Sequence, residues 1–275
     1  MPNCYLRGVG KDFYNLYLYR YAGVAGNTGV TYYDANNVAH TGYTAGDLEA
    51  GRPLYYHKVT AAEAAAGTFG SAKEGDDIRT TKGDLASKYE VGSAIPAWIG
   101  GFNASVRYKG FDLGVMFSYQ IGGKYYSVEY ANGGDGGRYN GSSNIRNNER
   151  AISRELYENT WSENRPDAKF PMLCYSSSGD GGAAIGDTQN YTDLALFDAS
   201  YLSIKNITLG YTFPSKWMSK AKISNLRIFA SADNPVMIYS HSGVDPRRPI
   251  SGGTDLGAAQ YPYLAVYTFG INLDF

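Results

Sequence analysis

The stretch that decides the fold is WIGGFNASVRYKGFDLGVMFSYQI, residues 98–121. In its first half, the even positions from Trp98 to Tyr108 are apolar or glycine, and the odd positions after Ile99 are small or polar. The pattern resumes from Phe111 to Ile121. Strict alternation is typical of a β-strand with one apolar and one polar face. Because only Lys109-Gly110 separates the halves, the stretch predicts an antiparallel hairpin with a two-residue turn.

Three further segments alternate in the same way. Residues 207–213 have apolar side chains at odd positions, whereas upstream the apolar Leu202 and Ile204 are at even positions. This change of phase predicts a bulge near Lys205-Asn206. Residues 225–233 form the next candidate strand. The last candidate strand ends the chain, and its apolar positions all fall on one face: Tyr263, Ala265, Tyr267, Phe269, Ile271, Leu273 and Phe275. The stretch from Tyr5 to Tyr21 has mixed phase and is interpreted as a sixth strand.

Length and composition narrow the class of protein. The chain has 275 residues with a net charge of −1, which argues against a nucleic-acid partner. With 43% hydrophobic residues the chain is not globally disordered, and no apolar run is long enough for a transmembrane helix. The predicted strands are longer than the roughly 5–6 residues usual in soluble sheets, whereas about 9–11 residues cross a bilayer. The fold class is therefore all-β: an antiparallel transmembrane β-barrel segment whose polar faces line a lumen.

The connections predict the orientation of this segment. Residues 109–110 and 214–224 are short connections, whereas 24–96, 122–199 and 240–262 are long. Outer-membrane barrels have short periplasmic turns and long extracellular loops. We therefore expect the three long segments outside the cell and the C-terminus in the periplasm. Short helices are predicted at 60–66, where Thr60 and Glu63 have capping-box spacing, and at 149–159, where Ile152 and Leu156 share a face.

Five or six strands are fewer than the eight of the smallest membrane barrels, and an open sheet edge is not stable in lipid. The sequence Met1-Pro-Asn-Cys4 also has no signal-peptide pattern. Both observations favour the C-terminal portion of a larger barrel, with no plug domain in residues 1–275.

At this point the sequence resembles a known family. The chain contains in this order Tyr21-Ala-Gly-Val24, Ile95-Pro-Ala-Trp-Ile-Gly-Gly101, Tyr108-Lys-Gly-Phe-Asp-Leu113, Trp161-Ser-Glu-Asn164, Tyr201-Leu-Ser-Ile-Lys-Asn-Ile-Thr-Leu-Gly-Tyr-Thr-Phe-Pro214, Leu226-Arg227, Ser242-Gly-Val-Asp-Pro246 and Thr268-Phe-Gly-Ile-Asn-Leu-Asp-Phe275. Together these runs resemble the C-terminal third of SusC/RagA-type TonB-linked outer-membrane proteins. Two positions depart from the family pattern, namely Pro235 after Asn234 and Arg247 after Asp245-Pro246.

The resemblance implies a 22-stranded TonB-dependent transporter that is plugged by an N-terminal domain and covered by a SusD-like surface lipoprotein. Such pairs import oligosaccharides or peptides with energy relayed through the TonB complex. The implied partners are therefore the lipoprotein, the TonB complex through the N-terminal part, the oligosaccharide or peptide ligand and outer-membrane lipid. The implied location is the Gram-negative outer membrane.

The candidate small-molecule sites are few. His40, His57 and His241 lack carboxylate or cysteine companions at ligand spacing, and Cys4 and Cys174 have no metal-type spacing. The glycine-rich runs at 133–137 and 179–182 lack the ligand ladder of a calcium loop. We expect no cofactor, no metal and no catalytic site, and the substrate-binding residues are unknown.

Several aromatic residues have a predicted structural role. Trp161 is expected to anchor its own loop beside Ile152 and Leu156 rather than to stack on a sugar. Tyr125, Tyr126 and Tyr130 are expected in the outer aromatic girdle.

The ending Tyr267, Phe269, Ile271, Leu273 and Phe275 resembles the signal that the barrel-assembly machinery reads. Two other classes of protein remain open at this point. One is a soluble β-sandwich carbohydrate-binding module, and the other is a non-transporting outer-membrane porin or adhesin.

Overall fold

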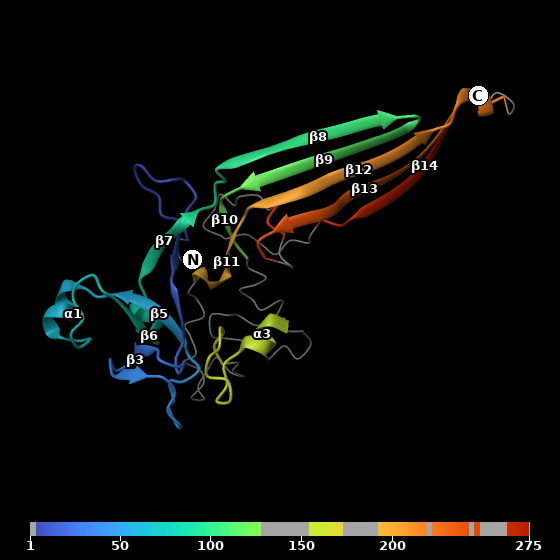
Figure 1. Cartoon of the computed structure of the whole chain (residues 1–275). Coiled ribbons are helices and arrows are strands. Elements are labelled where there is room, and N and C mark those ends of the chain that lie inside the picture. The colour runs from blue at the N-terminus through green and yellow to red at the C-terminus, as the bar shows by residue number, and fades with distance from the viewer. Residues whose placement is uncertain are drawn as a thin grey trace. The chain divides into compact units, whose positions relative to one another are not determined.

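The computed structural model describes residues 4–127, 154–172, 192–218, 222–241, 245–247 and 263–274 (Figure 1). Contacts divide the chain into two units. The N-terminal unit contains Met1–Ser93, Tyr126–Leu196 and Ile250–Ala259. The sheet unit contains Ala94–Tyr125, Phe197–Pro249 and Gln260–Phe275.

The sheet unit is built on one antiparallel sheet of five strands in the order β14-β13-β12-β9-β8 (Figure 1). Its strands are β8 (Trp98–Tyr108), β9 (Phe111–Ile121), β12 (Tyr201–Thr212), β13 (Asn225–Tyr239) and β14 (Val266–Asp274). All five segments with strict alternation are therefore strands of the same sheet, and the predicted all-β antiparallel class is confirmed.

The predicted hairpin is confirmed, and its turn has the backbone conformation that two-residue hairpin loops need. Lys109 and Gly110 have φ of 47° and 88°, so both lie in the left-handed region. A Cβ at Gly110 would come within 2.6 Å of the Thr212 carbonyl oxygen. Glycine is therefore required at this position by both backbone conformation and space.

The predicted bulge is also confirmed. Strand β12 pairs in register with β9 and β13 up to Ile204, and pairing resumes at Asn206. Lys205 is therefore the extra residue relative to β9. On β13 the same irregularity accommodates Asn234, with φ of 49°, and Pro235. Because a bulge tolerates proline, β13 continues to Tyr239 instead of ending at the predicted Asp233.

The N-terminal unit has shorter strands and a small mixed sheet in the order β2-β5-β6-β3-β4. Its strands are β1 (Asn15–Tyr19), β2 (Tyr21–Val24), β3 (Thr31–Tyr33), β4 (Ala39–Thr41), β5 (Pro53–Lys58), β6 (Asp77–Thr80) and β7 (Lys88–Ser93). The predicted helix near residue 60 is α1 (Ala61–Ala66). Thr60 and Glu63 form the predicted capping box, each side chain accepting from the other residue's backbone N–H.

The stretch from Tyr5 to Tyr21 differs from the expected sixth strand of the same sheet. Asn15–Tyr19 forms β1, which pairs with β7 in a separate two-stranded sheet, and Tyr21 is the first residue of β2 in the small mixed sheet. Leu16 and Leu18 are both buried, which is the environment of a short packed strand. The mixed phase of this stretch therefore reflects packing in the N-terminal unit.

The remaining elements are short. They are β10 (Lys124–Tyr126), which pairs with β11 (Leu196–Asp198), the helices α3 (Arg154–Asn159) and α4 (Ser215–Met218), and the 3₁₀ turns Gly83–Leu85 and Asp193–Ala195. Helix α3 occupies the described end of the predicted helix at 149–159. Among the described residues, no helix is long and apolar enough to cross a bilayer.

Two predictions about aromatic residues have different outcomes. Trp161 is only 4% exposed and packs with Val24, Ala50 and Ala168, so its buried structural role is confirmed, but two of these neighbours lie outside its own loop. The predicted neighbours Ile152 and the side chain of Leu156 lie outside the described residues. In contrast, Tyr125 and Tyr126 are buried, and Tyr125 packs with Phe197 and Ala199. Their assignment to the lipid-exposed girdle is therefore wrong, because a position next to a strand end does not by itself determine exposure.

Several predictions concern residues that the structure does not describe. They are those on Phe275, Tyr130, Ile152, Cys174, the side chain of Leu156 and the glycine-rich runs at 133–137 and 179–182.

Candidate functional site

The candidate site is the five-stranded sheet, whose two faces have opposite chemistry. On one face, apolar side chains of neighbouring strands stand directly opposite each other in rows. The rows are Tyr108-Phe111-Tyr211-Ile228-Ile271, Val106-Leu113-Leu209-Ala230-Phe269, Ala104-Val115-Ile207-Ala232-Tyr267, Phe102-Phe117-Ile204-Val236 and Gly100-Tyr119-Leu202-Ile238. We call this surface the apolar face. Direct cross-strand pairing fixes the register, because a slip of one residue would move each set to the other face.

The apolar face is open to its surroundings. Phe269 is 83% exposed, Ile271 70% and Val106 60%. Soluble proteins bury such a continuous apolar surface, and large exposed patches mark binding or membrane surfaces. Within the described part of the sheet unit, no second sheet packs on this one, which a β-sandwich would require.

The strands have the length that a bilayer needs. Strands β8 and β9 each have 11 residues. At about 3.4 Å per residue such a strand is about 37 Å long, and a tilt of about 40° reduces its height to about 28 Å. This height matches the apolar band of about 25 Å and the hydrocarbon core of about 30 Å.

The opposite face, which we call the polar face, carries ion pairs and hydrogen bonds across the strands. The Arg227 guanidinium on β13 contacts both carboxylate oxygens of Asp112 on β9, at 2.6 and 3.1 Å. The Asn206 amide on β12 donates to the Asp233 carboxylate on β13 at 2.7 Å. The side chains of Arg227 and Asp112 are each about one quarter exposed, as expected for a surface that faces water rather than lipid.

Glycines make room for these polar-face contacts. A Cβ at Gly210 on β12 would come within 2.4 Å of the Arg227 guanidinium and 2.6 Å of the Asp112 carboxylate. The ion pair therefore passes over Gly210. Likewise, a Cβ at Gly270 on β14 would be 2.3 Å from the ring of Phe229, which covers that glycine.

The far end of the polar face is held by Arg247. Its guanidinium pairs with Asp245 at 2.7 Å and donates to the Ser203 hydroxyl on β12 and the Asn234 amide oxygen on β13, both at 3.3 Å. It also lies 4.6 Å from the ring centroid of Tyr263. Arg247 departs from the family pattern, and the structure shows that it ties the segment before β14 to two other strands.

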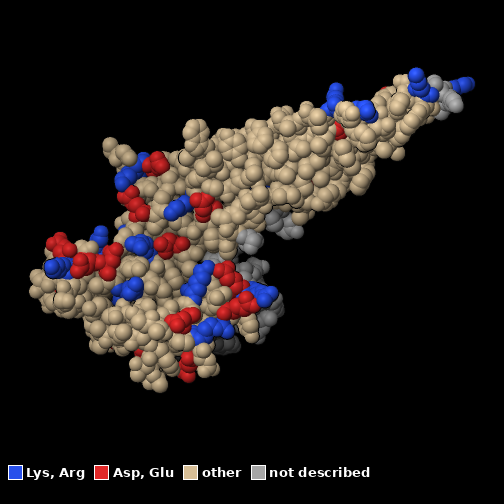
Figure 2. All heavy atoms as spheres, in the orientation of Figure 1, with Lys and Arg blue, Asp and Glu red and all other residues tan. Residues whose placement is uncertain are grey.

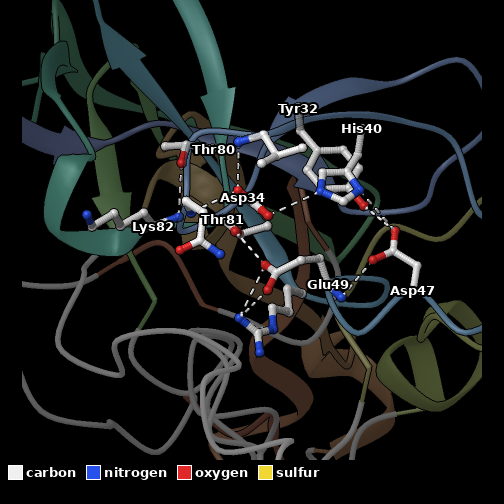
Figure 3. A network of polar contacts seen from close by, with 11 residues as sticks. Tyr32, Asp34, His40, Asp47, Glu49, Thr80, Thr81 and Lys82 are labelled. Carbon is white, nitrogen blue, oxygen red and sulfur yellow. Dashed lines mark hydrogen bonds and ion pairs between the residues drawn. The ribbon is translucent and has the colours of Figure 1, made fainter. Parts of the chain in front are cut away.

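The N-terminal unit contains a network of carboxylates around a stacked pair of rings (Figure 3). Tyr32 and His40 stack at 5.3 Å, and the Tyr32 hydroxyl donates to the Asp47 carboxylate at 2.8 Å. His40 Nε2 lies 3.3 Å from Asp34, and the Glu49 carboxylate accepts from the Thr81 hydroxyl at 2.7 Å. Burial and the Asp47 hydrogen bond raise the pKa of Tyr32, which therefore stays neutral. The network ties β3 and β4 to neighbouring turns.

The three histidines have different surroundings. His40 lies beside Asp34 and Asp47, and His57 lies 2.9 Å from Glu63 and 2.6 Å from the Leu85 carbonyl oxygen. The spacing of residues along the sequence did not predict that these carboxylates lie next to His40 and His57. The His241 ring stacks on Phe197 at 4.3 Å. Within the described ranges, no three His, Cys, Asp or Glu side chains are arranged to hold a metal ion.

The predicted assembly-signal residues lie on β14. Tyr267, Phe269, Ile271 and Leu273 are on the apolar face, opposite Ala232, Ala230, Ile228 and Leu226 of β13. The structure therefore shows one exposed apolar row on the last strand, and the last member, Phe275, lies outside the described residues.

Comparison with known proteins identifies similar sequences. The chain is 24% identical over 200 residues to TonB-dependent receptor P3 of Formosa agariphila, covering 69% of this chain and 17% of that receptor. It is 31% identical over 110 residues to TonB-dependent receptor SusC of Bacteroides thetaiotaomicron, covering 38% of this chain and 11% of SusC. The chain thus spans less than a fifth of the length of these relatives. No family model matches it.

Solved structures share the fold. The structure of the RagAB peptide transporter aligns with a TM-score of 0.60 and 22% identity, covering 95% of this chain and 23% of that one. The RagAB peptide importer in its 'open-open' state aligns with a TM-score of 0.56 and 20% identity, covering 95% and 22%. The sequence relatives and this shared fold together support a SusC/RagA-type fragment, similar in sequence to TonB-dependent receptors and in fold to RagAB.

Proposed function

We propose that the chain is part of an outer-membrane TonB-dependent transporter that imports oligosaccharides or peptides together with a SusD-like surface lipoprotein. The observation that carries this proposal is the sheet with one exposed apolar face and one polar face. In the proposed arrangement the apolar face contacts lipid and the polar face lines the lumen of a 22-stranded barrel. The chain supplies part of the wall and has no catalytic role.

The orientation follows from the connections. The turn at 109–110 and the connection at 214–224 lie on the periplasmic side, and so does the C-terminus. The segments 24–96, 122–199 and 240–262 are extracellular. One observation supports this orientation. Most of segments 24–96 and 122–199 belongs to the N-terminal unit, which has its own buried core. Loops of this kind offer ligand and lipoprotein contacts, and the TonB complex acts on the N-terminal part of the full receptor.

The experiment is an uptake measurement in the host cell. Deleting the receptor gene is expected to abolish uptake of a labelled oligosaccharide or peptide pool, and removing TonB is expected to have the same effect. The full-length receptor is also expected to co-purify with a surface lipoprotein. Uptake that persists without TonB would favour the porin, and a 275-residue chain that is monomeric and cooperatively folded in plain buffer would favour the soluble module.

The apolar row on β14 is proposed to act in assembly. Removing Phe275 from the full-length receptor is expected to lower its outer-membrane level, because the barrel-assembly machinery then lacks the terminal aromatic residue. Unchanged abundance and unchanged heat-dependent gel mobility would contradict this role.

A further inference from the structure

The end of the sheet with the short connections is strongly basic. Residues 109–110 and 214–224 contain four lysines and no Asp or Glu. Lys109, Lys216 and Lys222 are exposed. On the face drawn in Figure 2, basic side chains lie at this end of the sheet, and no charged side chain is in view over its middle. The two connections are neighbours, because the Thr212 N–H donates to the Gly110 carbonyl oxygen at 2.8 Å.

The carboxylates at the adjoining strand ends already have partners. Asp112 is held by Arg227 on the polar face, and Asp274 accepts from the Asn225 amide at 3.1 Å. The two connections themselves contribute four positive charges and no negative charge, so this basic end attracts anionic groups.

A ladder of aromatic rings leads from these lysines onto the apolar face. The rings of Phe111 and Tyr211 lie 4.5 Å apart, those of Tyr211 and Phe213 4.9 Å, and those of Phe213 and Trp217 6.5 Å. Trp217 is 62% exposed and directly follows Lys216. Aromatic rings of this kind prefer the level of lipid headgroups.

An apolar groove begins where this ladder reaches the sheet. It has a volume of about 520 Å³, within the range of ligand pockets. Phe111, Leu209, Tyr211, Ile228, Phe269 and Ile271 line it. Its floor includes Ala230, whose small side chain stands between those of Leu209 and Phe269 on the neighbouring strands.

We propose that this groove and the adjacent lysines bind one glycerophospholipid with a net anionic headgroup. The acyl chain lies in the groove over Ala230, the ester region lies against the aromatic ladder, and the phosphate lies near Lys109 and Lys216. An apolar chain and a negative headgroup in one molecule match the apolar and basic parts of the site. The inference rests on the proposed membrane orientation and adds a lipid partner of stated charge.

Headgroup selectivity follows from the charge. Each Lys near an anionic lipid surface contributes about 1 kcal/mol, or about fivefold in affinity. Phosphatidylcholine has the same phosphate but carries a compensating cation. The site is therefore expected to retain phosphatidylglycerol in preference to phosphatidylcholine.

The test uses the full-length receptor, purified from the outer membrane and equilibrated with equimolar phosphatidylglycerol and phosphatidylcholine. Lipid retained after a detergent wash is counted by mass spectrometry. Lys109→Ser with Lys216→Ser is expected to weaken phosphatidylglycerol retention about 25-fold and to remove the preference. The control is Lys58→Ser with Lys73→Ser, which removes two exposed lysines of the N-terminal unit and is expected to change nothing.

A second pair of variants tests the groove. Ala230→Phe fills its floor and is expected to lower retention of both lipids, whereas Ala104→Phe adds the same bulk to the apolar face on β8 and is expected to have no effect. The site would be overturned if the two lysine double variants lost phosphatidylglycerol retention equally. It would also be overturned if Ala230→Phe and Ala104→Phe retained lipid equally. A receptor that imports ligand without headgroup preference overturns only the lipid site, whereas a receptor absent from the outer membrane overturns the proposed function as well.

Discussion

Arginine at Ala104 is expected to disrupt the barrel, whereas arginine at the next residue is not. Strand β8 runs from Trp98 to Tyr108, so its middle is Asn103 and Ala104 lies about 3 Å from the bilayer midplane. Ala104 stands on the apolar face opposite Val115. An arginine on the lipid face at the midplane costs about 2–4 kcal/mol.

The matched control is Ser105→Arg. Ser105 lies on the polar face opposite Gly114, where an added Cβ would meet no atom within 4 Å. The new side chain therefore has space and water, and its cost is expected to stay within about 0.5 kcal/mol. Both variants add the same charge to the same strand at depths that differ by about 3 Å, so the main difference between them is the face.

The assay is urea unfolding of the full-length receptor in phosphatidylcholine vesicles, with the folded fraction read from heat-dependent gel mobility. Ala104→Arg is expected to lower the free energy of unfolding by about 2–4 kcal/mol. Outer-membrane abundance in cells should fall in parallel. An equal or larger loss in Ser105→Arg, or no loss in Ala104→Arg, would refute the assignment of the faces.

Three further changes test separate parts of the structure. Gly210→Ala is expected to displace the Arg227–Asp112 ion pair and to lower the free energy of unfolding by about 1–3 kcal/mol in the same assay. Gly114→Ala should be neutral, because a Cβ there meets no atom. Equal effects of the two variants would contradict the close approach of the ion pair to Gly210. Trp161→Ala is expected to cost about 3–5 kcal/mol and expose the N-terminal unit to limited proteolysis, unlike Trp217→Ala at an exposed position. Burial raises the pKa of Glu63, but hydrogen bonds from Thr60 and His57 outweigh it and lower this pKa to about 2. The contribution of Glu63 to stability is therefore complete above about pH 4.5 and is lost as the pH falls through about 2. Amide exchange in α1 should follow this course, and a Glu63→Gln variant with the same acid response would contradict it.

Local patterns predicted the strands and the bulge because their causes are local. Alternation with a period of two follows directly from the pleat, and Lys109-Gly110 can adopt the backbone conformation of a tight turn. The opposite phases around Lys205 likewise require one extra residue. These signals need no knowledge of which strands are neighbours.

The contacts across the sheet could not be predicted in this way. Asp112 and Arg227 are 115 residues apart, and they meet because β12 lies between β9 and β13. The same holds for Tyr125, whose burial depends on Phe197 and Ala199 from a distant segment. Neighbour relations of this kind depend on tertiary structure, and sequence reasoning therefore missed the ion pair and misjudged the tyrosine.

The histidine surroundings were missed for a related reason. Asp34 and Asp47 approach His40 because the β3–β4 hairpin and the following turn fold back on each other, and no standard ligand spacing describes that path. Resemblance to a family gave the class of protein, but it did not give these contacts.

The most direct test of the central claim is a cysteine scan of residues 102–107 in the full-length receptor in intact outer membranes. A lipid-soluble maleimide should label Phe102→Cys, Ala104→Cys and Val106→Cys, and a membrane-impermeant one should label Asn103→Cys and Ser105→Cys. This alternation is expected because successive side chains of β8 point to lipid and to the lumen in turn. Equal labelling of all positions by the impermeant reagent would contradict a membrane-spanning sheet.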